Sequence, residues 1–412
     1  MSKLEELIQK YCPDGVEWKP LGKICNIKGR IGFRGYTRDD QVKEGEGALS
    51  LSPSNIQGGQ MDYTKGTYIT WAKYEESPEI KTYNGDIILC KTASVGKVAL
   101  VKDLPYKATI NPQLVVLKDI KCSAPFLTYV LGTDEVQRKI ISMAGVGSVP
   151  NIPQKALAEI EIPIPPLPVQ EEIVRVLDTF TELQAELQAE LQKRLQQYNY
   201  YRDNLLSFEG RTDVEWKKLG DIASIKTGRR FVRTDIKESG VPCFHYGDLY
   251  TYYGLTATQT KGYLDEELAK KLRYAQPNDV VVVCAGENDM DLGVGVAWLG
   301  KEPAVVHDAC CILHHNQNPR YISHFLRTHN YHLQMKRYVK NGKISSLPAS
   351  GLAEALIPIP SLEEQERIAS ILDRFDALTT DLTAGLPAEI EKRRQQYEYY
   401  RDKLLTFKRK EA

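Results

Sequence analysis

"VQEEIVRVLDTFTELQAELQAELQKRLQQYNYYRDNLLSF" spans Val169–Phe208 and contains neither glycine nor proline over forty residues. Apolar residues recur through it in steps of three and four, the spacing of one face of a helix. The pattern predicts one continuous helix of about 60 Å, at about 1.5 Å per residue. A helix this long with an apolar face needs a partner along its length. The predicted contact residues are Ile173, Val176, Phe180, Leu183, Leu187, Leu191, Leu195 and Tyr198.

The end of this stretch returns near the C-terminus, because QQYNYYRDNLLSF (Gln196–Phe208) and QQYEYYRDKLLTF (Gln395–Phe407) agree at ten of thirteen positions. DGVEWKPLGKI, which begins at Asp14, returns as TDVEWKKLGDI, and IPIPPLPVQEEIVRVLDTF, which begins at Ile162, returns as IPIPSLEEQERIASILDRF. Weaker echoes pair GDIILC with NDVVVVC and ATINPQLVVL with AVVHDACCIL. A period of 195 to 199 residues indicates a duplicated domain, because solenoid repeats span about 20–50 residues.

The second copy supplies the partner helix. Antiparallel packing is favoured because a globular domain separates the two helices in sequence, although each helix could instead pack only on its own domain. Gly385 and Pro387 predict a break in the second helix, since glycine suits a helix C-terminus and proline a first turn. Its predicted contact residues are Ile368, Ile371, Phe375, Leu378, Leu382, Leu386, Ile390 and Tyr397.

Before each long helix, short β-rich runs are separated by turn residues, which indicates a sheet core. One shorter helix is expected within Ala124–Ile141, and Pro-rich breakers mark the boundary to the long helices. The predicted fold class is α+β, with two pseudo-symmetric sheet-containing domains separated by two long antiparallel, coiled-coil-like spacer helices. The expected divisions are an N-terminal helix (1–12), domain 1 (13–165), a central helix (166–209), domain 2 (210–360) and a C-terminal helix (361–412).

The chain begins with a segment that resembles the end of a long helix, since KLEELIQKYCPDGVEW (Lys3–Trp18) aligns with YRDNLLSFEGRTDVEW (Tyr201–Trp216). In a two-fold arrangement, the body of that helix is the C-terminal one. We therefore expect Leu4, Leu7 and Ile8 to pack near the end of the C-terminal helix, with the two termini close together.

Composition limits the function classes. The 412 residues are too many for one ordinary domain, and the 54 basic residues balance the 54 acidic ones, so any electrostatic footprint must be local. An apolar run of about eighteen residues is missing, as is the apolar core of a signal peptide, so a cytoplasmic protein without membrane contact is expected. Eight scattered cysteines fit reduced thiols.

A search for catalytic sequences returns almost nothing. The seven histidines all lie at position 245 or later, so they are not essential to any task that both copies share. The sequence has no phosphate-binding glycine loop and no G-x-S-x-G, and NPQL (Asn111–Leu114) lacks the second proline and the aromatic of an amino-methyltransferase site. HDACCILHH (His307–His315) would alternate His307 and Cys311 with Cys310 and His314 across a strand, which fits a buried strand better than a tetrahedral metal site. Neither a metal nor a cofactor is expected.

Basic residues cluster at equivalent places in both copies, at Lys19–Arg38 and Lys217–Arg233, interleaved with Phe33, Tyr36 and Phe231. A single such run is typical of a solvated surface. Two runs in register favour a nucleic-acid face, since phosphate contacts use Lys and Arg, and base readout uses side chains on a presented loop. The candidate DNA-binding residues are Lys28, Arg30, Arg34, Tyr36, Arg38, Lys226, Arg229, Arg230, Arg233 and Lys343.

The duplicated LEELIQKYCPDGVEWKPLG, IPIPPLPVQEEIVRVLD and QQYNYYRDNLL resemble the specificity (S) subunits of type I restriction-modification systems over nearly the full chain. The resemblance implies two target-recognition domains, each reading one half of an interrupted double-stranded DNA site. It also implies helices that set the gap and bind two methyltransferase (M) subunits, with restriction and motor (R) subunits joining through that core. The resemblance further implies that the S subunit itself performs no chemistry.

Three alternatives stay open: a self-sufficient methyltransferase or nuclease, a tandem scaffold without a DNA role, and an S subunit of a type IIB-like system. The first conflicts with the missing cofactor sequence, and the last differs only in its partner. The repeated tyrosines either pack at the helix ends or anchor an M subunit, because aromatic side chains dominate interface energies. The candidate partner-binding residues are Tyr198, Tyr200, Tyr201, Tyr397, Tyr399 and Tyr400.

Overall fold

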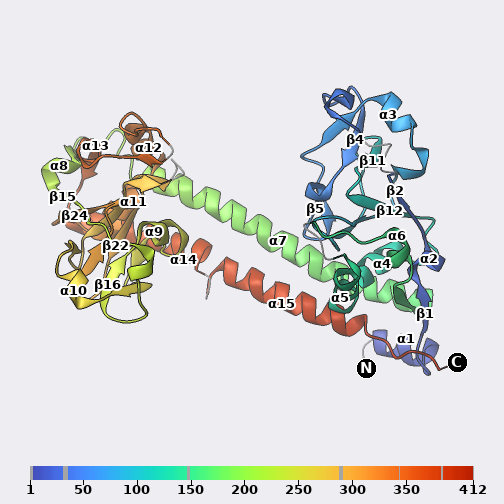
Figure 1. Ribbon diagram of the computed structural model, residues 1–412. Helices are drawn as coiled ribbons and strands as arrows, with labels where there is room; N and C mark the ends of the chain where they lie inside the picture. The colour runs from blue at the N-terminus through green and yellow to red at the C-terminus, as the bar shows by residue number, and fades with distance from the viewer. Residues whose placement is uncertain are drawn as a thin grey trace. The chain divides into compact units, whose positions relative to one another are not determined.

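A computed structural model describes residues 3–30, 36–145, 149–286, 291–342, 344–381 and 384–411. The chain forms two compact units (Figure 1). The first unit comprises residues 1–185 and 392–412, and the second comprises residues 186–391. The first unit is therefore discontinuous in sequence, and residues from the C-terminal end complete it.

The first unit contains a five-stranded sheet, order β3-β7-β4-β11-β8, and a four-stranded sheet, order β10-β9-β12-β2. Its larger strands are β2 (Asn26–Gly29), β4 (Ala48–Leu51), β7 (Thr67–Ile69), β9 (Ile87–Cys90), β10 (Val98–Leu100), β11 (Ala108–Ile110) and β12 (Leu114–Lys118). The two-residue strands are β3 (Gln41–Val42), β5 (Ile56–Gln57), β6 (Gln60–Met61) and β8 (Lys81–Thr82). Its helices are α1 (Lys3–Tyr11), α2 (Leu21–Ile24), α3 (Trp71–Glu75), α4 (Ala124–Leu131), α5 (Asp134–Met143) and α6 (Gln154–Ala158).

The second unit repeats this plan with a five-stranded sheet, order β15-β24-β20-β22-β17, and a four-stranded sheet, order β18-β16-β23-β19. Its strands are β15 (Ala223–Thr227), β16 (Val241–Phe244), β17 (Thr256–Ala257), β18 (Gly262–Leu264), β19 (Tyr274–Ala275), β20 (Val280–Val283), β21 (Ala285–Gly286), β22 (Gly295–Trp298), β23 (Ala304–Val306), β24 (Cys310–His315) and β25 (Ser345–Ser346). Its helices are α8 (Leu219–Ile222), α9 (Tyr246–Thr251), α10 (Glu266–Ala269), α11 (Pro319–Phe325), α12 (His329–Lys336) and α13 (Ala349–Ala353).

The Pro-rich breakers form edge strands. Strand β13 (Glu161–Ile164) pairs with β1 (Glu17–Pro20), and β26 (Leu356–Ile359) pairs with β14 (Glu215–Lys218), each in a two-stranded antiparallel sheet. Proline is tolerated there because an edge strand needs fewer backbone donors than a central one.

The single helix expected within Ala124–Ile141 is two helices, α4 and α5, and that expectation was wrong. Gly132 is the C-cap of α4, and Thr133 is the N-cap of α5. The apolar pattern continues across the break because both helices bury one face in the same cluster, which includes Phe126 and Ile140. Periodicity alone therefore could not reveal the interruption.

The long helices are α7 (Leu167–Leu205), α14 (Leu362–Thr380) and α15 (Leu386–Leu404), and they pack together. Within the first unit Phe180 stacks on Tyr400, with ring centroids 5.5 Å apart. Within the second unit Tyr201 stacks on Phe375 at 5.4 Å. Early α7 thus meets late α15, and late α7 meets α14, which is the order of antiparallel helices. The predicted fold class is confirmed.

The predicted contact residues differ in burial. Ile173, Tyr198 and Ile368 are buried, and the middle leucines of α7 are half-buried. Leu378 is 39% exposed, so its predicted contact position was wrong; it lies near the end of α14. Leu382 lies outside the described residues.

The predicted helix break is confirmed. The α14 helix ends at Thr380, five residues before Gly385, so glycine does not serve as its C-cap. Pro387 lies in the first turn of α15, where a missing backbone N–H costs nothing.

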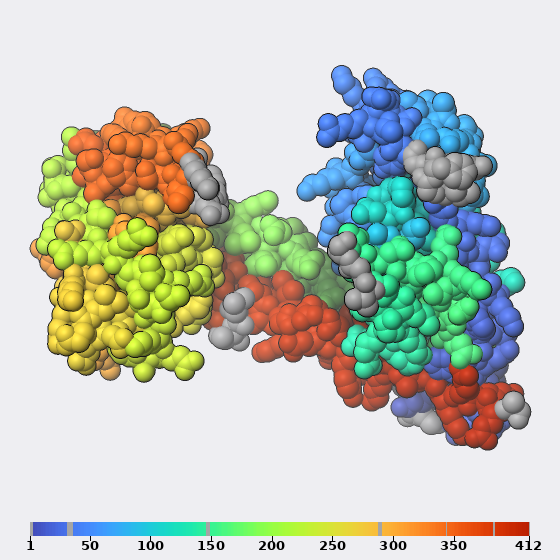
Figure 2. Space-filling view, in the orientation of Figure 1, coloured from blue at the N-terminus to red at the C-terminus, as the bar shows by residue number. Residues whose placement is uncertain are grey.

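The N-terminal segment (blue) and the C-terminal segment (red) lie side by side in the first unit, as the sequence predicts (Figure 2). Leu4 is buried in one cluster with Leu405, and Leu7 and Ile8 pack against that cluster. The backbone N–H of Val16 donates to Lys408 O at 2.9 Å, and Lys410 N–H donates to Val16 O at 2.9 Å. The N-terminal helix and the C-terminal segment therefore share one core.

Because all seven histidines lie in the second unit, we expect the two units to respond differently to mild acid. Burial lowers the pKa of five of these imidazoles below the usual value near 6.5. The unfolded chain then binds more protons than the folded one below pH 6.5, so this stability is present above pH 6.5 and is lost as the pH falls. These residues are His245, His307, His315, His324 and His332.

Thermal unfolding between pH 7.5 and 5.0, with each unit followed by limited proteolysis and mass spectrometry, tests this expectation. The melting temperature of the second unit should fall over this interval, while that of the first unit should stay nearly constant. An equal response of the two units would contradict the assignment.

Candidate nucleic-acid interface

In both units the basic segment reaches the carboxyl end of a parallel strand pair. In the first unit β11 runs parallel to β4, and in the second unit β23 runs parallel to β16. Carboxyl ends of parallel strands meet at one edge of a sheet, where loops present side chains for binding. The sequence did not reveal this edge, because strand pairing is nonlocal.

In the first unit Arg30 lies at this edge and is 4% exposed. Its Nε donates to Ile110 O at 3.2 Å, and its Nη2 donates to Thr109 Oγ1 at 3.3 Å. Burial lowers the pKa of the Arg30 guanidinium. The guanidinium also lies 5.7 Å from the ring centroid of Tyr36, whose hydroxyl accepts from Ser50 Oγ at 3.0 Å. Arg30 therefore holds the segment against the strand ends.

The other predicted DNA-binding residues of this unit differ in placement. Lys28 is exposed on β2, and Arg38 is exposed in a short 3-10 helix whose N-cap is Thr37. Tyr36 is half-buried. Arg34 and Phe33 lie outside the described residues.

In the second unit the basic segment crosses the end of β23. Arg229 N–H donates to Val306 O at 3.0 Å, and its Nη1 donates to Lys271 O at 2.8 Å. A Cβ on Gly228 would lie 2.3 Å from the carbonyl oxygens of Val306 and His307, so this close approach requires glycine. Phe231 is buried, with its ring centroid 5.0 Å from that of His307.

The charged side chains around this anchor are exposed. Lys226, Arg229, Arg230 and Arg233 all have exposed side chains. Phe231 was grouped with these basic residues in the sequence analysis. Because it is buried, it holds the loop that carries them in place. Lys343 lies outside the described residues.

The side chains that follow the parallel strands differ between the units. The first unit has Asn111, whose Nδ2 donates to Gln113 Oε1 at 3.1 Å. The second unit has His245 and His307, with ring centroids 4.8 Å apart. Each Nδ1 accepts a backbone N–H, from Gly247 and Ala309 respectively, and Nδ1 of His307 also lies 3.0 Å from Asp308 Oδ1. The first unit therefore has an amide at this edge where the second has two imidazoles, and all three residues are buried.

Sequence reasoning missed these residues as candidates. The sequence feature that could have identified them is the similarity of ATINPQLVVL to AVVHDACCIL, which aligns Asn111 with His307. His307 lies in the turn before β24, so the expectation that it shares a strand face with Cys311 was wrong. Within β24, Cys310 and Ile312 face one hydrophobic cluster while Cys311 and Leu313 face another. Among the described residues, no three His, Cys, Asp or Glu side chains are grouped so as to hold a metal ion.

The repeated tyrosines fall into three matched pairs. Tyr198 is buried and Tyr397 is half-buried. Tyr201 and Tyr400 stack on Phe375 and Phe180. Tyr200 and Tyr399, by contrast, are 66% and 61% exposed. The last pair consequently presents the most aromatic surface to solvent, at equivalent places on the two copies.

Two stretches of the sequence, residues 13–197 and 212–392, match the family described as "Type I restriction modification DNA specificity domain". The chain belongs to this family. It is the non-catalytic DNA specificity subunit of a type I restriction-modification system and a component of that complex. Within the part of the chain that the structure describes, no helix is long and apolar enough to cross a membrane.

Full-length relatives support this assignment. The EcoR124I/EcoR124II specificity subunit of Escherichia coli is 32% identical to the chain, and the match covers 100% of this chain and 98% of that protein. A putative type I specificity subunit of Haemophilus influenzae is 28% identical over 95% of this chain and 96% of its own length.

Solved structures show the same fold. The S subunit of a type I system from M. genitalium matches with a TM-score of 0.51 at 16% identity, over 95% of this chain and 96% of that one. A chain from a study of "complex assembly" and "conformational transition of the type I R-M system" matches with a TM-score of 0.60 at 17% identity, over 95% and 98%.

Replacing Arg229, Arg230 and Arg233 together by alanine should weaken DNA binding by the specificity subunit. Lost phosphate contacts weaken binding to all sequences alike and reduce its salt dependence, whereas a lost base contact costs about 1–3 kcal/mol at one position. Binding to duplex DNA at several salt concentrations measures both effects. The control is Lys270→Ala, which removes an exposed charge that pairs with Glu267. Unchanged binding by the triple variant would contradict the assignment.

Proposed function

We propose that each unit reads one half of a bipartite double-stranded DNA site. One observation carries the proposal: in both units a basic segment reaches the carboxyl end of a parallel strand pair, beside side chains that differ between the copies. Shared basic residues suit the phosphate backbone, which every sequence has in common, and different neighbours suit different bases. Lys28, Arg30, Arg34, Tyr36 and Arg38 would serve one half-site, and Lys226, Arg229, Arg230, Arg233 and Lys343 the other.

Arg30 has a specific place in this proposal. Its described contacts lie within the first unit, so we assign its effect on DNA to the shape of the segment that it holds. The exposed Lys28 and Arg38 are better placed for phosphate contacts. A direct contact of Arg30 with DNA stays a prediction.

We propose the division of the chain as follows: residues 1–12 form an N-terminal helix, 13–165 the first recognition domain and 166–209 the central spacer helix. Residues 210–360 then form the second recognition domain and 361–412 the C-terminal spacer helix. The edge strands β13 and β26 support both boundaries to the long helices, because each ends within three residues of the helix that follows.

Two methyltransferase subunits are the proposed direct partners, and restriction subunits would join through the resulting core. Matched apolar exposure supports two equivalent surfaces: Tyr200 and Tyr399 are exposed, as are Leu167 and Leu362 at the starts of α7 and α14. Two copies of one surface fit two copies of one partner. A cytoplasmic location follows from the proposal, because that is where the DNA to be read lies.

Co-expression of the chain with its neighbouring methyltransferase gene tests the function. Single-molecule sequencing of the host genome should then reveal modified adenines within one bipartite sequence with a fixed gap. Exchanging residues 210–360 for the equivalent domain of another specificity subunit should change one half of that sequence and leave the other intact. Modification without a bipartite pattern would overturn the proposal.

Replacing Tyr200 and Tyr399 together by serine should reduce assembly with the methyltransferase subunit, because exposed aromatic anchors contribute most where an interface is buried. Pull-down of the methyltransferase by the purified chain measures assembly, and the melting temperature reports on the fold. The control is Asn199→Ala with Glu398→Ala, which alters equivalent neighbours on the same turns. A lower melting temperature with intact assembly would instead favour a packing role.

A further inference from the structure

The most similar parts of the two copies meet at the junction between each recognition domain and its spacer helices. Gln170, in the first turns of α7, is 3% exposed, and its Oε1 accepts the N–H of Ser123 at 2.9 Å. Its Nε2 donates to Pro165 O at 2.7 Å. Ser123 is the N-cap of α4, so one side chain joins the breaker, the spacer helix and the domain helix.

The second unit repeats this arrangement. Gln365 is fully buried, and its Oε1 accepts the N–H of Asn318, the N-cap of α11, at 2.9 Å. Its Nε2 donates to Pro360 O at 2.9 Å and lies 2.8 Å from Gln317 Oε1. The glutamine of QEEI and QERI therefore has the same internal role in both copies.

A second matched contact lies further along each spacer helix. In the first unit the hydroxyl of Tyr129 on α4 donates to Asp178 Oδ1 on α7 at 2.5 Å. In the second unit Nε2 of His324 on α11 lies 2.9 Å from Asp373 Oδ1 on α14. The aspartates occupy equivalent positions, and only the domain residue that binds each of them differs.

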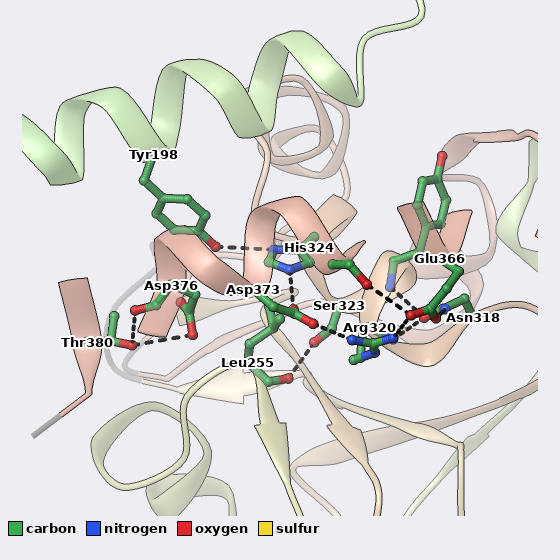
Figure 3. A network of polar contacts seen from close by, with 12 residues as sticks. Tyr198, Leu255, Asn318, Arg320, Ser323, His324, Glu366, Asp373, Asp376 and Thr380 are labelled. Atoms are coloured by element: carbon green, nitrogen blue, oxygen red, sulfur yellow. Dashed lines mark hydrogen bonds and ion pairs between the residues drawn. The ribbon is translucent and has the colours of Figure 1, made fainter. Parts of the chain in front are cut away.

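In the second unit this contact extends to both spacer helices (Figure 3). The hydroxyl of Tyr198 on α7 lies 3.2 Å from Nδ1 of His324, whose other nitrogen faces Asp373. Arg320 bridges Asp373 and Glu366. Helix α11, which carries His324 and Arg320, also contacts the sheet, because Ser323 Oγ lies 2.9 Å from Leu255 O and 2.8 Å from Gly295 O. A path of directed contacts thus runs from the spacer helices to the recognition sheet.

Apolar packing alone would allow small rotations of the domain on its helix, because hydrophobic contacts are not directional. Hydrogen bonds fix distance and angle, and a buried polar group is costly when it loses its partner. Where apolar packing already stabilises the junction, buried polar contacts can select one orientation of the domain on its helix over others.

We propose that Asp178 and Asp373 are positioning residues that, with Gln170 and Gln365, fix the rotation of each recognition domain on its spacer helices and so fix the gap between the two DNA half-sites. The inference rests on the proposed function, which supplies the two half-sites. It adds residues at the junctions between domain and helix, and these are not among the proposed DNA contacts.

The test uses the full chain assembled with its methyltransferase subunits. Methyl transfer is measured on duplexes that carry both half-sites at the native gap and at gaps one base pair longer and shorter. In Asp178→Ala and Asp373→Ala the ratio of native-gap to altered-gap rates should fall by a factor on the order of ten, because a small misplacement strongly affects a fixed geometry. Asp178→Asn and Asp373→Asn keep an acceptor oxygen and should largely restore the ratio.

Thr179→Ala and Arg374→Ala are matched controls, because each alters the exposed residue next to one aspartate and should leave the ratio unchanged. A purely structural role would lower the rates on all three duplexes by the same factor and keep the ratio, which would overturn the inference. If an alanine variant does not fold, Tyr129→Phe is used instead, because it removes only the hydroxyl that donates to Asp178. This variant should also lower the ratio of native-gap to altered-gap rates. An unchanged ratio in Tyr129→Phe would overturn the inference. Failure of the proposed function would show in the wild-type complex itself, as methylation that is independent of the gap.

Discussion

Burial of a helix end in the core of each unit is the contact on which the rest of the structure depends. In the first unit Leu405, just after α15, lies in one cluster with Leu4 and Leu131. In the second unit Leu206, just after α7, has the same role beside Phe325. Because burying a leucine side chain stabilises by about 1.5–3 kcal/mol, a unit without its helix end would lose a substantial part of its stability. The core of the first unit is therefore complete only when the segment that contains Leu405 packs into it.

Much of this organisation could be predicted from the sequence. The absence of glycine and proline over Val169–Phe208 predicted α7 to within three residues at either end, because an uninterrupted apolar face is a local signal. The packing of Leu4 against the C-terminal segment followed from the repeat, since equivalent sequences are expected to occupy equivalent places. The division of Ala124–Ile141 into two helices could not be found, because both helices face the same core.

The candidate interface was less accessible to prediction. Charge indicated the right segments, but the sequence could not show that Arg30 turns inward, because its acceptors, Ile110 O and Thr109 Oγ1, are about eighty residues away. The same holds for His245 and His307, which come together only when β16 pairs with β23. Local patterns identify elements, whereas a site built at a sheet edge depends on which strands become neighbours.

Comparison of the two copies separates residues that the fold requires, which are the same in both, from residues that can differ between them. Gln170 and Gln365 have the same partners in both copies, since each must satisfy the N-cap residue of a helix and a proline carbonyl at once. The residues at the parallel strand ends also make internal hydrogen bonds, but their types differ between the copies, with Asn111 in one and His245 and His307 in the other. The junction itself shows how far a substitution is tolerated. Tyr129 and His324 have different shapes, yet each makes a hydrogen bond to the equivalent carboxylate, Asp178 or Asp373. The contact is therefore kept in both copies. Its dependence on pH differs, because only the second copy uses an imidazole, whose pKa is lowered by burial.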